Sequence, residues 1–336
     1  MVYQTVKEMY KRAVQIVDAR FGLISNKREI IYNPEYFESC QDIQCLLTDI
    51  HRVDEIPFSD ELDAYVYAYD FDDVPLTVTV DDRSIRMTGN IIQMEAGMTD
   101  RRYSLFGNLG LFFRYAMATL ERYHGIFSFH ASAMYNPAEN DLILIVGSAG
   151  AGKTCVMLEG LKRNYQMFST EMTHFKFDGG KCLFYKGSLI DNVRIGNFVY
   201  DFPEVPKLLG VEVPEVKDVW GTKIVIDLSG NTTAKDVLVN PDLTLLFPKI
   251  EEGREKAIFG DVTDERKIAK LLFDNATEKI AQTPLYYDSV PVGCLDSSDL
   301  MQKRLEAMQK LASGKISKIR KAKTILASPT NCMKEV

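Results

Sequence analysis

The feature that most constrains the fold of this sequence is an apolar run, residues 141–146, followed at once by a glycine-rich loop, residues 147–154. The run reads Asp-Leu-Ile-Leu-Ile-Val, which is typical of a buried strand, and residues 155–163 after the loop have a helical pattern that ends at Asn164. Strand, glycine-rich loop and helix in this order predict a phosphate-binding loop, and therefore a nucleoside triphosphate site in an α/β domain.

Each residue type in the loop has a physical role. Glycines let backbone N–H groups curve around phosphates, the lysine adds positive charge, and the threonine hydroxyl can hold Mg²⁺. The helix N-terminus that follows also favours anions. ATP and Mg²⁺ are the expected cofactors, although the motif leaves ATP and GTP undistinguished. The residues predicted to contact the nucleotide are Gly147, Ser148, Ala149, Gly150, Ala151, Gly152, Lys153, Thr154 and Cys155.

A chain of 336 residues is longer than one usual domain, so we expect at least two. Residues 1–104 are predicted to form a β-rich accessory or substrate domain, with a short amphipathic helix at 4–20 and strands around 21–31, 63–71 and 75–90. Residues 105–300 carry the phosphate-binding loop, and residues 301–336 are expected to form a basic helical tail.

Charge is distributed unevenly along the chain. The net charge is −7, yet residues 301–323 hold eight Lys and Arg against a single acidic residue, Glu306. The rest of the chain is therefore acidic, which argues against a main body that coats nucleic acid. A polyanionic partner would meet only the basic tail, and such a tail is more often simply a solvated end.

The N-terminus and the cysteines predict a cytoplasmic protein. The chain begins Met1-Val-Tyr-Gln-Thr, without the basic start and apolar stretch of a signal peptide, and its six cysteines form no Cys-x-x-Cys pair. The most apolar predicted helix, residues 105–123, contains Asn108, Arg114, Glu121 and Arg122, too many polar groups for a bilayer span. We therefore expect no membrane partner.

Two motifs carry a resemblance to a known family. The stretch Phe129-His-Ala-Ser-Ala-Met134, followed by a turn, a strand and the glycine-rich loop, resembles the catalytic domain of the HPr kinase/phosphorylase family over about residues 105–300. Asn192-Val-Arg-Ile-Gly196 lies where that family has a Glu-Val-Arg-Gly signature, and Leu246-Phe-Pro248 precedes a C-terminal helix in the same way. The resemblance implies an α/β P-loop kinase domain of the HPr kinase type and a ring-like homo-oligomer.

The resemblance also implies roles for single residues. His130 would lie beside the phosphates that Lys153 binds, Thr154 would hold Mg²⁺, and Arg194 would neutralise charge on the transferred phosphoryl group. Read without the resemblance, His130 is a core histidine bonded to backbone, and Arg194 is a surface residue.

Two positions depart from the family pattern. The family's paired Asp residues fall on Thr170 and Glu171, so Glu171 is the candidate base on the acceptor hydroxyl or ligand of a Mg²⁺ water, whereas Thr170 cannot act as a base at neutral pH. Asn192 replaces a metal-binding Glu, and the adjacent Asp191 can substitute for it. Outside the resemblance, Asp227 at the end of the run 223–228 is an alternative metal partner.

The predicted function is an ATP-dependent phosphotransferase that moves the γ-phosphate to a hydroxyl acceptor. The acceptor is a serine-type hydroxyl of a small molecule, a peptide or a protein. Because phosphoryl transfer depends mostly on positioning and charge neutralisation, the loss of one Asp leaves kinase activity feasible. The alternative is a nucleotide-binding switch, or pseudokinase, that hydrolyses ATP slowly and transfers no phosphate.

Overall fold

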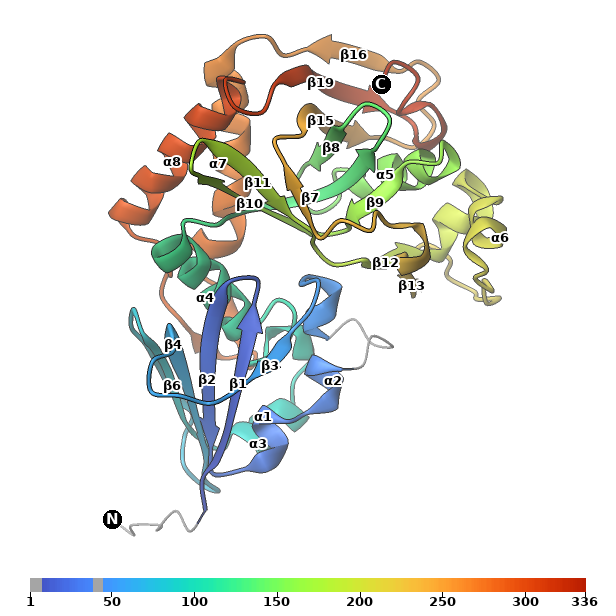
Figure 1. Ribbon diagram of the computed structural model, residues 1–336. Coiled ribbons are helices and arrows are strands. Elements are labelled where there is room, and N and C mark those ends of the chain that lie inside the picture. The colour runs from blue at the N-terminus through green and yellow to red at the C-terminus, as the bar shows by residue number, and fades with distance from the viewer. Residues whose placement is uncertain (1–7, 39–44) are drawn as a thin grey trace. The chain divides into compact units, whose positions relative to one another are not determined.

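The computed structural model describes residues 8–38 and 45–336, and the chain divides into two compact units (Figure 1). The first unit extends to Gly125 and also includes Lys279–Asp296. The second unit comprises Ile126–Glu278 and Ser297–Val336. This division differs from the predicted boundaries, because residues 105–125 and 279–296 belong with the N-terminal unit rather than with the glycine-rich loop.

The first unit is built on a six-stranded mixed sheet with the order β3-β1-β2-β4-β6-β5. The pairs β2–β4 and β4–β6 are parallel, and the other pairs are antiparallel. The N-terminal unit is therefore rich in β-strands. The strands are β1 (Tyr10–Ile16), β2 (Ala19–Ser25), β3 (Asp54–Ile56), β4 (Ala64–Asp70), β5 (Thr77–Val80) and β6 (Ser84–Gly89).

The helix predicted at residues 4–20 is wrong over the residues that the structure describes. Residues 10–25 form the β1–β2 hairpin, in which Val14 lies opposite Phe21, while residues 4–7 fall outside the described part of the chain. Val14 and Ile16 are fully buried, and their branched side chains suit a pleated surface. Pairing with β2 and β3 therefore overrides the weak helical periodicity of the segment.

Short helices complete the first unit. In α4 every residue is buried, and Phe112 packs edge-to-face on Phe21 with ring centroids 5.1 Å apart. Arg114 of α4 donates hydrogen bonds to the carbonyls of Lys279 and Gln282, which ties the 279–296 segment to this unit. The elements are α1 (Arg28–Ile31), α2 (Pro34–Phe37), η1 (Leu46–Thr48), α3 (Ile91–Ala96), η2 (Arg101–Tyr103), α4 (Leu111–Thr119), the π-helical turn η3 (Leu120–His124), β17 (Leu285–Tyr286) and β18 (Val290–Pro291).

The second unit is built on a nine-stranded sheet with the order β14-β11-β10-β7-β8-β15-β19-β16, and β9 also pairs with β7. A separate two-stranded ribbon joins β12 to β13. The strands are β7 (Phe127–Asn136), β8 (Asp141–Val146), β9 (Gln166–Ser169), β10 (Met172–Asp178), β11 (Lys181–Tyr185), β12 (Ile190–Arg194), β13 (Lys223–Asp227), β14 (Val237–Val239), β15 (Asp242–Ile250), β16 (Ile258–Asp261) and β19 (Ile319–Ala327).

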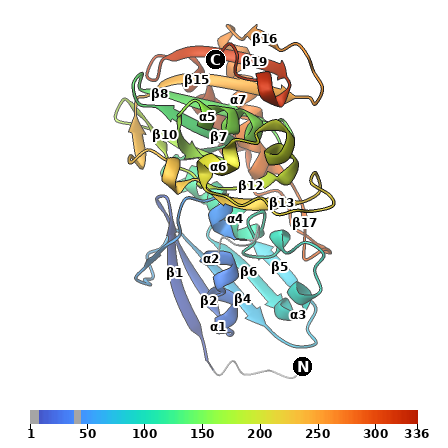
Figure 2. The ribbon, with the colours of Figure 1, turned by 90° about the vertical axis from the view of Figure 1, so that its right-hand side faces the viewer.

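Strand β8 separates two hydrophobic cores. Leu142 and Leu144 belong to the core under α7 and α8, and Ile143 and Ile145 to the core under α5. Figure 1 shows α7 and α8 on one side of the sheet, and Figure 2 views the unit from the side of α5 and α6. The predicted α/β class is confirmed as a three-layer arrangement. The helices are α5 (Lys153–Lys162), α6 (Val205–Leu209), α7 (Glu265–Ala281) and α8 (Ser298–Ala312), with short turns η4 (Asn197–Asp201), η5 (Ser229–Asn231) and η6 (Pro329–Asn331).

The segment expected as a basic helical tail is an integral part of the second unit. Its helix α8 covers the sheet, and β19 pairs in parallel with β15 and antiparallel with β16. Arg304 is fully buried and donates to Thr277 Oγ1 at 3.1 Å, and Arg320 forms an ion pair with Glu139. The basic composition hid the strand because its first half is rich in Lys and Arg, with the buried Ala322 lying between Lys321 and Lys323.

Within residues 8–38 and 45–336, no helix is both long and apolar enough to cross a membrane. The five cysteines in these ranges are free, and burial raises the pKa of Cys155 to about 12. Cys155 is therefore a protonated thiol near neutral pH, which gives it little redox reactivity.

Gly187 lies in the segment that follows β11, where the backbone packs closely against the start of β10. A Cβ at this position would lie 1.7 Å from the backbone carbonyl oxygen of Met172. We expect Gly187→Ala to lower the free energy of unfolding by about 1–3 kcal/mol or more, because backbone must move to relieve the overlap. Gly230→Ala is the matched control, since nothing lies within 4 Å of its added Cβ. Chemical denaturation of both variants checks the difference, and equal stabilities would contradict this packing.

Candidate functional site

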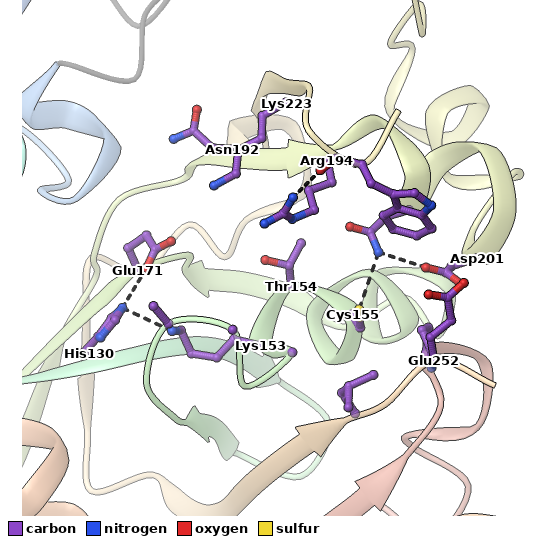
Figure 3. A pocket seen from close by; sticks show the side chains of 17 residues that line it. His130, Lys153, Thr154, Cys155, Glu171, Asn192, Arg194, Asp201, Lys223 and Glu252 are labelled. Atoms are coloured by element: carbon purple, nitrogen blue, oxygen red, sulfur yellow. Dashed lines mark hydrogen bonds and ion pairs between the residues drawn. The ribbon is translucent and has the colours of Figure 1, made fainter. Parts of the chain in front are cut away.

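A cavity of about 330 Å³ in the second unit lies at the C-terminal end of β8, beside the N-terminus of α5 (Figure 3). Nine of the residues singled out from the sequence line it: His130, Ala149, Gly150, Gly152, Lys153, Thr154, Cys155, Glu171 and Arg194. The structure thus brings together side chains from β7, the glycine-rich loop, the β9–β10 turn and β12. Gly147, Ser148, Ala151 and Asp191 are not part of this lining.

The glycine-rich loop has a backbone that requires glycine at specific positions. Gly150 and Gly152 have φ angles of +82° and +94°, a region that L side chains rarely adopt. A Cβ on Gly152 would also lie 2.2 Å from Cγ1 of Ile250, whereas the space next to Gly150 is open. A ligand can therefore approach the backbone closely at Gly150, while Gly152 lets α5 begin against β15.

Lys153 is almost fully buried and points back toward the loop and β7. Its Nζ donates to the carbonyl oxygens of Gly147 at 3.0 Å and Ser148 at 3.4 Å. The same ammonium lies 3.1 Å from Nε2 of His130. The lysine charge is thus held at the point where the loop, the first turn of α5 and β7 meet.

His130 is surrounded by three charged side chains. Its Nε2 lies 3.1 Å from Oε2 of Glu171 as well as from Lys153, and its Nδ1 lies 3.1 Å from Oε1 of Glu278 on α7. Figure 3 shows Glu171 and Lys153 next to the ring. Although His130 is buried, it is not a histidine bonded only to backbone. The sequence identified three members of this cluster and missed Glu278, which lies far along the chain and in no motif.

The two contacts at Nε2 compete, because a ring nitrogen either accepts or donates one hydrogen bond. A lysine ammonium is a donor only, so an unprotonated Nε2 accepts from Lys153. An ionised carboxylate accepts only, so a protonated Nε2 donates to Glu171. The Glu171 carboxylate and Nε2 of His130 therefore place two possible proton acceptors side by side next to the loop.

Thr170 and Glu171 point in different directions. The Thr170 hydroxyl lies 3.1 Å from the carbonyl oxygen of Ser188 and 2.7 Å from that of Ile190, and the residue is 2% exposed. Glu171 instead lines the cavity. Thr170 therefore has a structural role, and Glu171 alone of the two offers a carboxylate to a ligand.

Thr154 and Asp191 are the best-placed oxygen ligands for a cation. The Thr154 hydroxyl donates toward Oδ2 of Asp191 at 3.5 Å, and Asp191 is 2% exposed. Burial, with the nearby negative charge of Glu171, raises the pKa of Asp191 to about 7. Among the described residues no three His, Cys, Asp or Glu groups surround one point. Mg²⁺ needs only one or two carboxylates plus phosphate and water oxygens, so Thr154 and Asp191 fit this ion.

Two cations face the loop across the cavity. Arg194 of β12 lies directly opposite Lys223 of β13, and both line the cavity with Asn192. Like charges placed directly opposite on two strands are destabilising. Arg194 donates to the carbonyl of Trp220, which fixes the guanidinium without neutralising it. The ribbon therefore presents positive charge to the cavity. The sequence analysis did not identify Lys223, because only the pairing of β12 with β13 places it beside Arg194.

The far end of the cavity has a different character. Asn197 bonds to Sγ of Cys155 at 3.6 Å and to Oδ2 of Asp201 at 2.9 Å, and Trp220 and Glu252 also line this end. Figure 3 shows Cys155, Asp201 and Glu252 on the opposite side of Thr154 from His130. No motif marked this acidic and aromatic end in the sequence.

The alternative metal partner Asp227 lies outside the cavity lining. It ends β13, which belongs to the two-stranded ribbon rather than to the sheet that contains β8. Its exposed carboxylate accepts a hydrogen bond from the backbone N–H of Ser229 at 2.8 Å. Asp227 therefore caps a turn.

Comparison with known proteins adds no relative. No protein-family model matches the chain, and no curated protein is detectably similar to it. The resemblance to HPr kinase catalytic domains therefore stays a prediction that rests on the motifs.

The buried Asp191 predicts a pH-dependent stability. Its folded pKa lies above the usual unfolded value of about 3.9, so the stability linked to its protonation is complete below pH 4 and is lost as pH rises through 7. Without Mg²⁺ and nucleotide, we expect Asp191→Asn to gain roughly 2–3 kcal/mol relative to wild type between pH 5 and pH 8. Urea unfolding at several pH values measures this gain. The exposed Asp227→Asn is the control, and parallel behaviour of the two variants would refute the raised pKa.

Proposed function

We propose that this protein is an ATP-dependent kinase that transfers the γ-phosphate to a hydroxyl acceptor, as the resemblance to HPr kinase-type P-loop kinases implies. One observation carries the proposal. The Glu171 carboxylate lies 3.1 Å from Nε2 of His130, and the same nitrogen lies 3.1 Å from Nζ of Lys153, the lysine of the glycine-rich loop. A module that only bound nucleotide would need the loop but not a proton acceptor beside it.

The loop and the ribbon divide the task of binding the phosphates. Backbone N–H groups of residues 149–154 and the N-terminus of α5 offer hydrogen bonds to the β-phosphate and neighbouring oxygens. On nucleotide binding Lys153 turns from His130 toward the phosphates. Arg194 and Lys223 approach from the opposite wall and stabilise the negative charge on the transferred group. The nucleoside extends past Cys155 toward Asp201 and Trp220.

Glu171 and His130 act on the acceptor. The acceptor oxygen attacks the γ-phosphorus, its bond to phosphorus forms as the bond from phosphorus to the β-phosphate oxygen breaks, and ADP leaves. The hydroxyl proton passes to Glu171, whose partner His130 shares it. General-base help of this kind is worth about 10²–10⁴ in rate. The acceptor is therefore a serine-type hydroxyl of a small molecule, peptide or protein that reaches the Glu171 end of the cavity.

Mg²⁺ fits beside Thr154 and Asp191. When bound there with the nucleotide, the ion would neutralise phosphate charge and orient the β- and γ-phosphates. The positive ion would also favour the ionised form of Asp191. Glu171, which already influences the pKa of Asp191, lies near enough to contact a water in the shell of the ion.

The second candidate function is a nucleotide-dependent switch that hydrolyses ATP slowly. The structural role of Thr170, which leaves one carboxylate where the resembled family has two, favours this alternative. A kinase releases ADP in proportion to the acceptor supplied, whereas a switch shows basal hydrolysis that a partner protein changes.

The kinase proposal predicts different effects for two substitutions. We expect Lys153→Ala to weaken ATP binding about 10- to 100-fold, because it removes a charge-assisted contact to the phosphates. We expect Glu171→Gln to retain ATP binding but to lower the transfer rate about 10²- to 10⁴-fold, because the amide accepts no proton. Isothermal titration measures binding. Mass spectrometry of fractionated cell extract incubated with Mg-ATP detects products that are heavier by one phosphoryl group.

Asp227→Asn is the matched control, because it removes an equal charge at an exposed carboxylate outside the cavity. Full transfer by Glu171→Gln would exclude Glu171 as the base. ATP binding without a phosphorylated product in any fraction would overturn the kinase proposal in favour of the switch.

A further inference from the structure

We infer that Glu278 is a positioning residue that fixes the tautomer of His130 and thereby makes Nε2 the proton-accepting atom. The inference rests on the proposed function for its consequence in catalysis, but its structural content is independent of any reaction. Neither the glycine-rich loop nor the His-Ala-Ser motif points to Glu278, which comes from α7 on the other face of the sheet.

Nδ1 of His130 lies in a buried environment next to a carboxylate. His130 is 4% exposed, and its Nδ1 is buried without a well-aligned hydrogen bond. Oε1 of Glu278 lies 3.1 Å from this atom, and the Glu278 side chain is 21% exposed. An ionised carboxylate only accepts, so Nδ1 must carry the proton for this contact to be favourable.

The second step is the opposite edge of the ring. With the proton on Nδ1, the lone pair of the neutral imidazole is on Nε2, where Lys153 donates to it at 3.1 Å. The opposite tautomer would donate its Nε2–H to Glu171, which also lies 3.1 Å from Nε2, but it would leave two lone pairs, those of Nδ1 and Glu278, facing one another. The Nε2 edge thus has one neighbour for each tautomer: Lys153 favours the Nδ1–H form and Glu171 favours the Nε2–H form. Glu278 at the buried edge therefore selects the Nδ1–H form.

The third step is the rigidity of the support. Asn275, one helical turn before Glu278, donates from Nδ2 to the backbone carbonyl of His130 at 2.9 Å. Residues three apart lie on the same face of a helix, so α7 holds both the backbone and the ring of His130. Leu272 and Ala276 anchor this part of α7 in the core. A site supported from a packed helix keeps its geometry better than one built from loops.

The consequence is a defined sequence of contacts. Before nucleotide binds, the Nε2 lone pair accepts from Lys153. Once Lys153 turns to the phosphates, the same lone pair is left to Glu171, and the two share the proton removed from the acceptor hydroxyl. Glu278 balances the positive charge that the ring gains in that step. Loss of an orienting carboxylate can cost about 10⁴ in rate when it produces the wrong histidine tautomer.

The decisive experiment is long-range ¹H–¹⁵N NMR of the full-length, nucleotide-free protein labelled at histidine. A His130→Gln variant assigns the signals of His130 among the four histidines. In wild type we expect Nδ1 to carry the proton and Nε2 to show the signature of an unprotonated ring nitrogen. In Glu278→Met we expect the proton to move to Nε2, where Glu171 accepts it. An Nε2–H tautomer in wild type, or an unchanged tautomer in Glu278→Met, overturns the inference.

Asn275→Ala is the matched control on the same face of α7. It removes a hydrogen bond to the backbone of His130 but touches neither ring nitrogen, so stability falls while the tautomer stays the same. A tautomer change in this variant would assign the effect to general loosening of α7 and would overturn the specific role of Glu278.

Kinetics then separates this inference from the proposed function. For an active kinase, Glu278→Met lowers kcat by about 10²-fold or more and leaves the KM for ATP within about threefold, because Glu278 contacts His130 and not the phosphates. A raised KM with unchanged kcat contradicts the positioning role. If wild type transfers no phosphate although the NMR shows the expected tautomers, the kinase proposal fails and the role of Glu278 in orienting His130 stands.

Discussion

The rest of the second unit depends on the burial of β8 on both faces. Its side chains alternate between the core under α7 and α8 and the core under α5, so layers are required on both sides of the sheet. β8 lies between antiparallel β7 and parallel β15, and the glycine-rich loop follows at its C-terminal end. Gly152 then lets α5 begin against Ile250. The position of the candidate site follows from this strand.

A cluster of charges is built onto that frame at the boundary between core and cavity. His130 and Lys153 are nearly buried, and such groups are stable only when their hydrogen-bonding atoms have partners. The loop carbonyls, Glu171 and Glu278 supply those partners. Because the partners come from opposite faces of the sheet, the cluster connects the loop side of the unit to α7. A ligand that moves the Lys153 ammonium away from His130 removes a positive charge and a hydrogen-bond donor from this cluster.

The ribbon of β12 and β13 closes the cavity from another direction. It pairs Arg194 with Lys223 and carries Asp191 on the buried side next to Thr154. One short ribbon thus contributes positive charge toward the cavity and a carboxylate toward the loop threonine. The alternation of side chains along a strand produces this division, since residues 191 and 194 point to opposite faces.

The sequence by itself determined the local features that repeat within a few residues. It predicted β8, the glycine-rich loop and α5, and it predicted the neighbouring strands because their apolar runs are short and bounded by turn residues. It also selected His130, Lys153 and Glu171, which the structure brings together. It failed at β1, where a weak helical period gave way to pairing with β2 and β3. It also failed at β19, where lysines masked a strand.

Only the tertiary structure decided the features that join distant segments. Glu278 reaches His130, and Lys223 faces Arg194, through contacts that span many residues and follow no short spacing. The boundary between the units was likewise set by contacts such as those of Arg114 with the 279–296 segment. Propensity and periodicity act over one helical turn or one strand. Which groups become the partners of a buried charge depends on which surfaces pack together in the folded protein.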